Sequence, residues 1–279
     1  MKKLLLATVF GFIAFSAQAQ EKGYPAARSY VDITNPFYIP ERGFLADSDL
    51  SFSRVRLDAS INAPRQTGFP VLKNANKYAA SETLTYGITG TWAVYGTIAY
   101  DWTKKEGASS FRDWNWTVGT KVNTIEDAWR IQIGADVTRT RYTKWKGVIN
   151  ENRKDTHLYV MAGTETGEKA FVYTRLDYRN INYANNLQYD VFSVDAALHL
   201  TPSAEQTADV GLRFAWDTLG RVRNRDLIFF ADGYMSLYQN LALGLKADYV
   251  LASANNIKIP YAPTNQGSYS LGLNIKYEF

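Results

Sequence analysis

The stretch YSLGLNIKYEF, residues 269–279, alternates strictly between two kinds of side chain. Every second residue is aliphatic or aromatic, and the residues between them are small, polar or charged. A period of two places successive side chains on opposite faces of an extended chain. The stretch therefore predicts a β-strand with one apolar face and one polar face.

The same alternation recurs through most of the chain before this stretch, most clearly in residues 241–251. It predicts twelve strands. The predicted strands cover residues 48–59, 80–90, 94–104, 112–122, 129–142, 156–166, 169–180, 187–200, 207–217, 226–237, 241–252 and 267–279. The first is the least regular: Leu50 and Phe52 are out of phase with Val55 and Leu57, so we expect a β-bulge between the two pairs.

The connections between these strands alternate in length. Short turns such as 201–206 are followed by longer loops such as 218–225, and the longest loop covers residues 60–79. Short turns on one side and longer loops on the other are typical of an up-and-down meander across a bilayer. We therefore predict an all-β fold, a single up-and-down antiparallel transmembrane β-barrel of about 12 strands over residues 48–279.

Residues 1–19 have the features of a secretory signal peptide. Two lysines precede an apolar run over residues 4–15, and Ala17 and Ala19 form a small-residue cleavage motif. The run is shorter than the roughly 20 residues of a membrane-spanning helix, which favours export over anchoring. Residues 20–47 are irregular, and we predict an N-terminal extension that lies either in the periplasm or in the barrel lumen.

Composition excludes several other classes of protein. The chain has 279 residues, no cysteine and a formal net charge of +4. Its 46% apolar and 21% charged residues exclude a disordered chain. The small net charge excludes a nucleic-acid-binding domain, and the missing cysteines exclude a disulfide framework. The sequence shows no metal-ligand cluster and no phosphate-binding loop, so we expect no metal and no cofactor.

Two features indicate that the apolar strand faces meet lipid. The polar faces carry nine basic and eleven acidic residues by this phase assignment, and twelve strands enclose more space than aliphatic side chains fill. Aromatic residues of the apolar faces, such as Trp92, Trp129, Trp102 and Trp216, fall near strand ends. They match the aromatic girdles of membrane barrels. The near balance of charge predicts weak ion preference.

Residues 48–279 resemble the outer-membrane β-barrel proteins of Gram-negative bacteria. The terminal strand, ending in Tyr277, Glu278 and Phe279, matches the pattern of that family, and residues 33–38 are similar to the start of some uncharacterised, porin-like members. The resemblance implies an outer-membrane location. It also implies that Tyr277 and Phe279 belong to a carboxy-terminal signal for the barrel-assembly machinery.

Five charged residues of alternating sign are expected near mid-height on adjacent strands, from register counted across the turns. This lumen charge belt consists of Arg175, Asp195, Arg213, Asp232 and Lys246. Two interpretations stay open. The belt could line a pore constriction and filter polar solutes, or it could consist of mutually neutralising pairs in a closed polar interior.

The sequence favours a passive, porin-like channel for small hydrophilic solutes. A closed structural or surface-interaction barrel is the alternative. An outer-membrane lipid hydrolase is least favoured, because His157 and His199 are expected at opposite ends of their strands and cannot share a site. We therefore predict no catalytic residue and no enzyme. The expected partners are outer-membrane lipids and lipopolysaccharide, the barrel-assembly machinery and small polar solutes.

Overall fold

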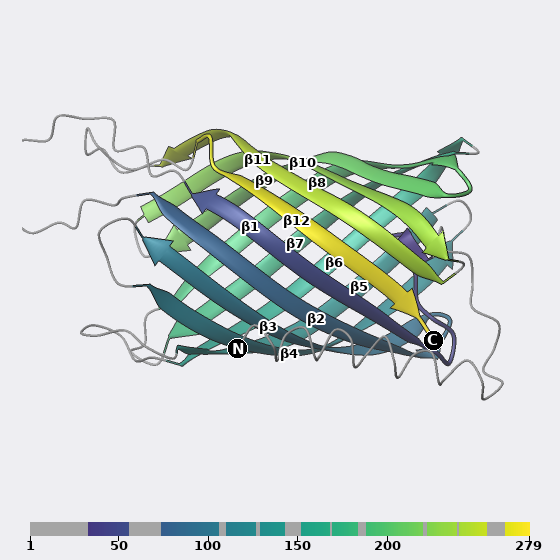
Figure 1. The fold of residues 1–279 in the computed structure, drawn as a ribbon, viewed down its shortest axis with the longest axis horizontal. Coiled ribbons are helices and arrows are strands. Elements are labelled where there is room, and N and C mark those ends of the chain that lie inside the picture. Colours follow the sequence, from purple (N-terminus) through teal and green to yellow (C-terminus); the bar gives the residue numbers. More distant parts are fainter. Residues whose placement is uncertain are drawn as a thin grey trace, which may run out of the picture.

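The computed structural model describes residues 33–55, 74–105, 110–126, 129–142, 152–167, 169–183, 188–219, 222–238, 240–255 and 266–279. Within these ranges, twelve strands form a closed barrel in which sequence neighbours pair antiparallel and β1 pairs with β12 (Figure 1). Closure leaves no sheet edge with unpaired backbone groups, which hydrocarbon would not tolerate. The predicted up-and-down antiparallel barrel is confirmed.

The strands are long enough to cross a membrane. They have 10 to 17 residues, and a strand of about 11 residues tilted by about 40° spans roughly 25 Å. The strands are β1 (Phe44–Val55), β2 (Ala75–Thr89), β3 (Trp92–Lys105), β4 (Phe111–Glu126), β5 (Trp129–Tyr142), β6 (Arg153–Gly167), β7 (Ala170–Tyr183), β8 (Gln188–Ser203), β9 (Gln206–Leu219), β10 (Val222–Tyr238), β11 (Leu241–Asn255) and β12 (Tyr269–Glu278).

The first strand differs from the prediction. β1 begins at Phe44 rather than near residue 48, and its register with β2 and β12 runs without a shift. The predicted β-bulge after Phe52 is therefore wrong. Leu50 and Phe52 share the outward phase, and Val55 lies in the inward phase. Pairing with two neighbours fixes the phase of β1, and an apolar residue at the barrel rim is tolerated on either face.

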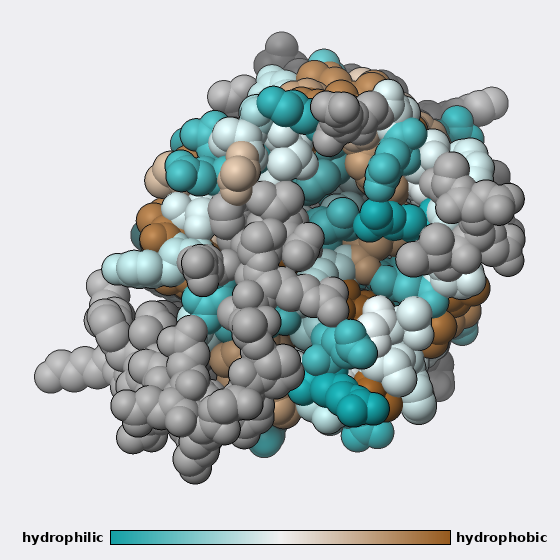
Figure 2. Space-filling view, turned by 90° about the vertical axis from the view of Figure 1, so that its right-hand side faces the viewer, coloured by the Kyte–Doolittle hydropathy of each residue, from teal (hydrophilic) through white to brown (hydrophobic). Residues whose placement is uncertain are grey.

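The outer surface is apolar and the interior is charged. Ile98, Val118 and Leu245 lie in the outward phase and are 54%, 72% and 65% exposed. Several charged side chains of the inward phase are buried: Asp155, Asp195 and Asp209 are only 2%, 4% and 7% exposed. In the end-on view of Figure 2, hydrophobic residues lie mainly around the outer rim. This is the inverse of a water-soluble barrel and fits a bilayer.

Aromatic rings form contacts near both ends of the outer surface, as the sequence predicts. Near the long loops, Tyr78 stacks on Trp102 with centroids 5.3 Å apart. At the other end, Phe44 lies 4.8 Å from Tyr86 and 5.5 Å from Phe279. These rings suit the polar–apolar boundaries of a membrane.

The two ends of the barrel are distinguished by their connections. We call the end with the short connections the turn end and the opposite end the loop end. Phe44 and Phe279 both lie at the turn end (Figure 1). No helix within the described ranges is long and apolar enough to cross a membrane. The predicted signal peptide, residues 1–19, lies outside the described residues.

Candidate functional site in the barrel lumen

All five residues of the lumen charge belt lie on inward strand faces. Asp195 on β8 is directly opposite Arg175 on β7 and Arg213 on β9. Asp232 on β10 is opposite Lys246 on β11. Both sets of neighbours agree with the predicted order of charges along the wall.

The belt is nevertheless interrupted between β9 and β10. Arg213 is opposite Ile228, and the residue opposite Asp232 on β9 is Asp209, so two carboxylates stand side by side. The prediction that Arg213 lies near Asp232 is therefore wrong. β9 reaches Leu219 and β10 begins at Val222, so both strands extend into the predicted 218–225 loop, and the register lies four residues away from the position estimated from sequence.

Side-chain contacts divide the belt into separate ion pairs. The Nε and Nη2 atoms of Arg213 donate hydrogen bonds to the two carboxylate oxygens of Asp195, each at 2.8 Å. Lys246 donates to Asp49 on β1 at 2.7 Å rather than pairing with Asp232. A bidentate guanidinium–carboxylate pair is strong and directional, so the Arg213–Asp195 pair fixes this part of the wall.

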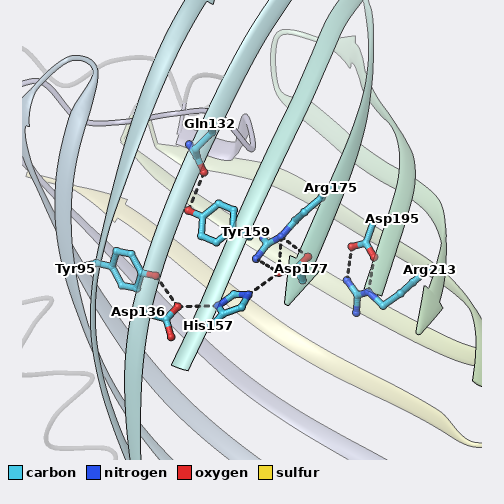
Figure 3. A network of polar contacts seen from close by, with 9 residues as sticks. All are labelled: Tyr95, Gln132, Asp136, His157, Tyr159, Arg175, Asp177, Asp195 and Arg213. Carbon is cyan, nitrogen blue, oxygen red and sulfur yellow. Dashed lines mark hydrogen bonds and ion pairs between the residues drawn. The ribbon is translucent and has the colours of Figure 1, made fainter. Parts of the chain in front are cut away.

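A second polar network, which the sequence analysis missed, lies beside the belt (Figure 3). The ring nitrogens Nδ1 and Nε2 of His157 lie 2.8 Å and 2.7 Å from carboxylate oxygens of Asp136 and Asp177. The Tyr95 hydroxyl donates to Asp136 at 2.8 Å, and Arg175 donates to both oxygens of Asp177 at 2.8 to 3.0 Å. The network thus joins β3, β5, β6 and β7 along one wall.

An aromatic side chain links this network to the turn end of the lumen. The Tyr159 hydroxyl donates to Gln132 at 3.0 Å, and the Arg175 guanidinium lies 4.3 Å from the Tyr159 ring centroid. Tyr159 and Gln132 are 7% and 3% exposed. A cation over an aromatic face is attracted to the ring, so Tyr159 holds Arg175 towards the wall.

The network escaped sequence reasoning because a long loop does not fix register. Asp136 and His157 are directly opposite each other, yet they flank the predicted 143–155 loop. β6 begins at Arg153, three residues before its predicted start, so the predicted loop was too long and gave no reliable partner for Asp136. Asp155, His157 and Tyr159 are every second residue of β6 and so share one strand face. This spacing was the pattern in the sequence that could have indicated a polar network in the lumen.

The described lumen is acidic. The strand register places nine basic and fifteen acidic side chains in the inward phase, a difference of −6, so the predicted near balance is wrong. The basic residues are Lys77, Lys121, Arg130, Arg153, Arg175, Arg179, Arg213, Lys246 and Lys276. The acidic residues are Asp47, Asp49, Asp101, Asp113, Asp136, Asp155, Glu165, Asp177, Asp195, Asp209, Asp217, Asp226, Asp232, Asp248 and Glu278.

The segment before β1 enters the lumen at the turn end. We call residues 33–40 the plug. Its centre is a turn in which Tyr38 N–H donates to the Asn35 carbonyl at 2.9 Å, while Phe37 N–H donates to the Asn35 side chain at 2.9 Å. Asparagine at the first position and Pro36 at the second are the residues that such a turn favours. The sequence Asn-Pro-Phe-Tyr thus builds a compact turn carrying two aromatic rings.

The two rings of the plug reach opposite walls. Phe37 packs edge-on against Phe171, with centroids 5.2 Å apart, in a buried cluster of β6 and β7. Tyr38 packs with Leu45 of β1 and Ala242 of β11, and its hydroxyl donates to Glu278 of β12. β7 is six positions from β1 in the ring of strands. The turn therefore bridges the full width of the barrel.

Polar contacts hold the plug backbone to further strands. Lys121 and Asn123 of β4 donate to the carbonyls of Tyr38 and Phe37 at 3.3 Å and 2.5 Å. The hydroxyls of Thr207 on β9 and Thr34 lie 2.9 Å apart. These bonds satisfy polar groups that would otherwise be buried unpaired.

Backbone contact closes the remaining side of the plug. A Cβ atom at Gly87 on β2 would lie 1.4 Å from the Pro40 carbonyl oxygen, so only glycine permits this approach. A barrel of twelve strands about 4.8 Å apart and tilted about 40° has a backbone diameter of roughly 24 Å. Side chains from both walls together with the plug obstruct that width at the turn end.

The histidines show no hydrolytic arrangement. Within the described ranges, neither His157 nor His199 hydrogen-bonds a serine or threonine hydroxyl, and His199 Nδ1 lies 3.1 Å from Asp209. The same ranges contain no group of three or more histidine, aspartate or glutamate residues suited to a metal ion.

The predicted assembly-signal residues lie at the turn end on the outer face. Phe279 exchanges two backbone hydrogen bonds of 2.9 Å with Phe44, and its ring lies 5.9 Å from that of Tyr277. These contacts close the seam between the first and last strands. Recognition of Tyr277 and Phe279 by assembly machinery stays a prediction.

Comparison with known proteins agrees with the fold. A scan against protein-family models and a search of curated proteins found no match. Among solved structures, the chain is similar to the COG4313 outer membrane channel from Pseudomonas putida F1, with a TM-score of 0.65 and 12% identity over 88% of this chain and 98% of that chain.

Two other solved structures show the same architecture. The translocator domain of autotransporter NalP from Neisseria meningitidis has a TM-score of 0.57 and 9% identity, over 90% of this chain and 92% of that chain. The NanC porin has a TM-score of 0.50 and 10% identity, over 83% of this chain and 98% of that chain. The chain has the fold of outer-membrane β-barrel proteins, and these neighbours support the predicted outer-membrane location.

Proposed function

We propose that the chain is a passive outer-membrane channel for small hydrophilic solutes, with a periplasmic gate formed by the plug. The observation that carries this proposal is the charged wall of the lumen, with nine basic and fifteen acidic inward side chains. So many ionised groups are stable only beside water or opposite partners. An aqueous path through the barrel supplies that water.

The sign of the wall indicates the class of solute. A net inward charge of −6 from the described side chains raises the local concentration of cations and repels anions. The paired residues Arg213 and Asp195 provide both signs at one height. We therefore expect small polar solutes with a positive or balanced charge to pass more readily than anions.

The plug is suited to act as a gate because no covalent bond beyond the chain itself holds it. Two aromatic rings and a few hydrogen bonds dock it. Short turns of outer-membrane barrels face the periplasm, so the gate controls the periplasmic exit. Displacement of residues 33–40 would open the obstructed end.

A closed structural barrel is the second candidate. The observation that favours it is the burial of the plug, in which Ile33, Phe37 and Ile39 are only 1%, 4% and 3% exposed. A plug that never leaves would make the lumen a sealed polar interior. The absence of enzymatic activity also stays a proposal, supported by the separation of His157 from His199.

A removable lock distinguishes the two candidates. The chain has no cysteine, so Thr34→Cys with Thr207→Cys introduces one possible disulfide at the position where the two hydroxyls lie 2.9 Å apart. We expect little current in planar bilayers from the oxidised protein and recovery of conductance after reduction. Each single variant is the control and should not respond to oxidation.

The outcomes separate channel from gate. An absence of current from folded protein in both redox states would remove the channel proposal and leave the closed barrel. Equal current in both states, with the disulfide shown by mass spectrometry, would remove the gate. Selectivity is read from the reversal potential in a potassium chloride gradient, where Asp195→Asn is expected to reduce cation preference.

Lipopolysaccharide is proposed as a partner of the outer surface near the loop end. Arg139 on β5 and Lys154 on β6 are directly paired in the outward phase, and Arg141 lies two residues along. Like charges placed opposite each other are destabilising unless an anion lies between them. Phosphate groups of the outer leaflet would supply that anion, and the predicted assembly machinery would act at the turn end.

A further inference from the structure

His157 lies between two carboxylates in the wall of the lumen. Its Nδ1 and Nε2 atoms are 2.8 Å and 2.7 Å from carboxylate oxygens of Asp136 and Asp177, and the residue is 6% exposed. An ionised carboxylate only accepts hydrogen bonds, whereas a neutral imidazole ring has one donor and one acceptor. Both contacts are therefore complete only when both ring nitrogens carry a proton and the ring is positively charged.

The ring is the part of this site that titrates in the physiological range. Histidine is the side chain whose ordinary change of charge falls between about pH 5 and 8, whereas aspartate titrates below that range, and tyrosine and arginine above it. In the described part of the chain, the titratable and charged side chains that face His157 are Tyr95 of β3, Asp136 of β5, Asp155 and Tyr159 of β6, and Arg175, Asp177 and Arg179 of β7. Arg179 is directly opposite His157 and is exposed, so water in the lumen screens its charge.

Tyr159 connects this site to the next part of the wall. It lies two residues from His157 on the same face of β6, and the two ring centroids are 5.5 Å apart. Arg175, which donates to both oxygens of Asp177, lies over the Tyr159 ring at 4.3 Å (Figure 3). A shift of the Asp177 carboxylate therefore moves Arg175 and removes part of the support of the Tyr159 ring.

From Tyr159 the contacts continue to the plug. The Tyr159 hydroxyl donates to Gln132 at 3.0 Å, the Gln132 amide donates to Asn123 at 2.7 Å, and Asn123 donates to the Phe37 carbonyl. Met161, the next inward residue of β6, packs directly on Phe37. Tyr159 and Gln132 are buried, so water does not readily replace a broken bond between them. The set of contacts therefore couples the His157 site to the docked plug.

We propose that the protonated ring of His157 holds the plug in its docked position, so that the gate closes in acid and opens as the pH rises. This inference rests on the proposed gate and adds its regulation. With a neutral ring, one carboxylate faces a nitrogen lone pair instead of a donor, and the support of Arg175 and Tyr159 is weakened.

Thermodynamic linkage gives the direction of the effect. The docked plug is bonded to the complete network, so the docked state binds the proton on His157 more tightly than the undocked state does. Docking is therefore favoured at a pH below the titration range of the ring. That advantage is lost as the pH rises through the range.

A spin label on the plug measures docking without any current. The chain has no cysteine, so Pro36→Cys, at the half-buried apex of the turn, gives a single labelling site. In proteoliposomes, we expect the ratio of mobile to immobile nitroxide to rise about tenfold between about pH 5 and 8, which corresponds to a tenfold difference in proton affinity. His157→Gln presents one donor group and one acceptor at every pH, like the neutral ring, so its ratio should stay at the high value throughout.

Two further variants in the labelled chain locate the sensor and the route. His199→Gln should keep the pH dependence, because among the described side chains His199 bonds one carboxylate, Asp209, at 3.1 Å, and the one donor of a neutral ring satisfies it. Tyr159→Phe keeps the aromatic ring but removes the bond to Gln132, so it should reduce the dependence although the sensor is intact. Heat-modifiable migration in gels verifies folding of each variant.

The outcomes distinguish the regulation from the gate. A mobility that does not change with pH, or that changes equally in His157→Gln, would overturn the role of His157, and full pH dependence in Tyr159→Phe would overturn the route. Currents in planar bilayers are recorded over the same pH range. Current with pH-independent mobility would leave the channel and remove its regulation, whereas pH-dependent mobility without current at any pH would remove the channel and leave pH-dependent docking.

Discussion

Truncation of one plug ring, Phe37→Ala, should open the channel. Phe37 is 4% exposed and packs on Phe171 and Met161. Replacing a buried phenylalanine by alanine removes about 3 kcal/mol of packing free energy. The ring is packed only when the plug is docked, so the substitution destabilises the docked state and not the undocked one. A loss of about 3 kcal/mol shifts the ratio of undocked to docked plug by roughly 100-fold.

Single-channel recording in planar bilayers measures this shift. We expect an open probability close to its maximum. The conductance of each open channel should not change, because the charged side chains of the lumen wall are unaltered. Phe229→Ala removes an equivalent ring that faces lipid and is 39% exposed, and it should leave gating unchanged. A folded Phe37→Ala protein with the open probability of the parent chain would refute the assignment of the plug as a gate.

Three further substitutions give separate tests. Gly87→Val should expel the plug and raise basal conductance, because its Cβ would lie 1.4 Å from the Pro40 carbonyl oxygen. Gly233→Val is the control, because its Cβ would have nothing within 4 Å, and equal currents from the two variants would contradict the prediction. Arg213→Gln should lower the free energy of unfolding by about 2 kcal/mol. Buried Asp195 loses both hydrogen bonds, and the partial exposure of Arg213 keeps the loss below that of a fully buried pair. Arg130→Gln, which breaks the exposed pair with Glu165, is the control in thermal gel-shift assays. A comparable loss of stability in both variants would refute the larger value expected for Arg213→Gln. Phe279→Ala should reduce the yield of folded barrel in membranes, because the ring contact with Phe44 closes the seam, and an unchanged heat-modifiable fraction would argue against that role.

The sequence predicted much of the lumen wall where it also predicted short turns. Asp232 and Lys246 are opposite each other as expected, because the β10–β11 connection leaves few possible registers. The estimate failed where the predicted loops were too long: β9 and β10 extend to Leu219 and Val222, into the predicted 218–225 loop, and β6 begins at Arg153, inside the predicted 143–155 loop. These errors misplaced Arg213 and hid the contact of His157 with Asp136. A flexible loop allows several strand offsets at similar cost, so pairing along the whole strand decides between them.

The sequence by itself determined the number of strands through alternation, because a period of two is a local property of an extended chain. Alternating connection lengths indicated the antiparallel order, and the charges of one strand face, together with aromatic residues near strand ends, indicated which face meets hydrocarbon. Only the tertiary structure decided where residues 33–40 lie. The Asn35 turn is encoded locally, but the pockets that receive Phe37 and Tyr38 are built from strands at opposite sides of the closed ring. Those pockets exist only after closure, because closure brings residues distant in sequence around one lumen.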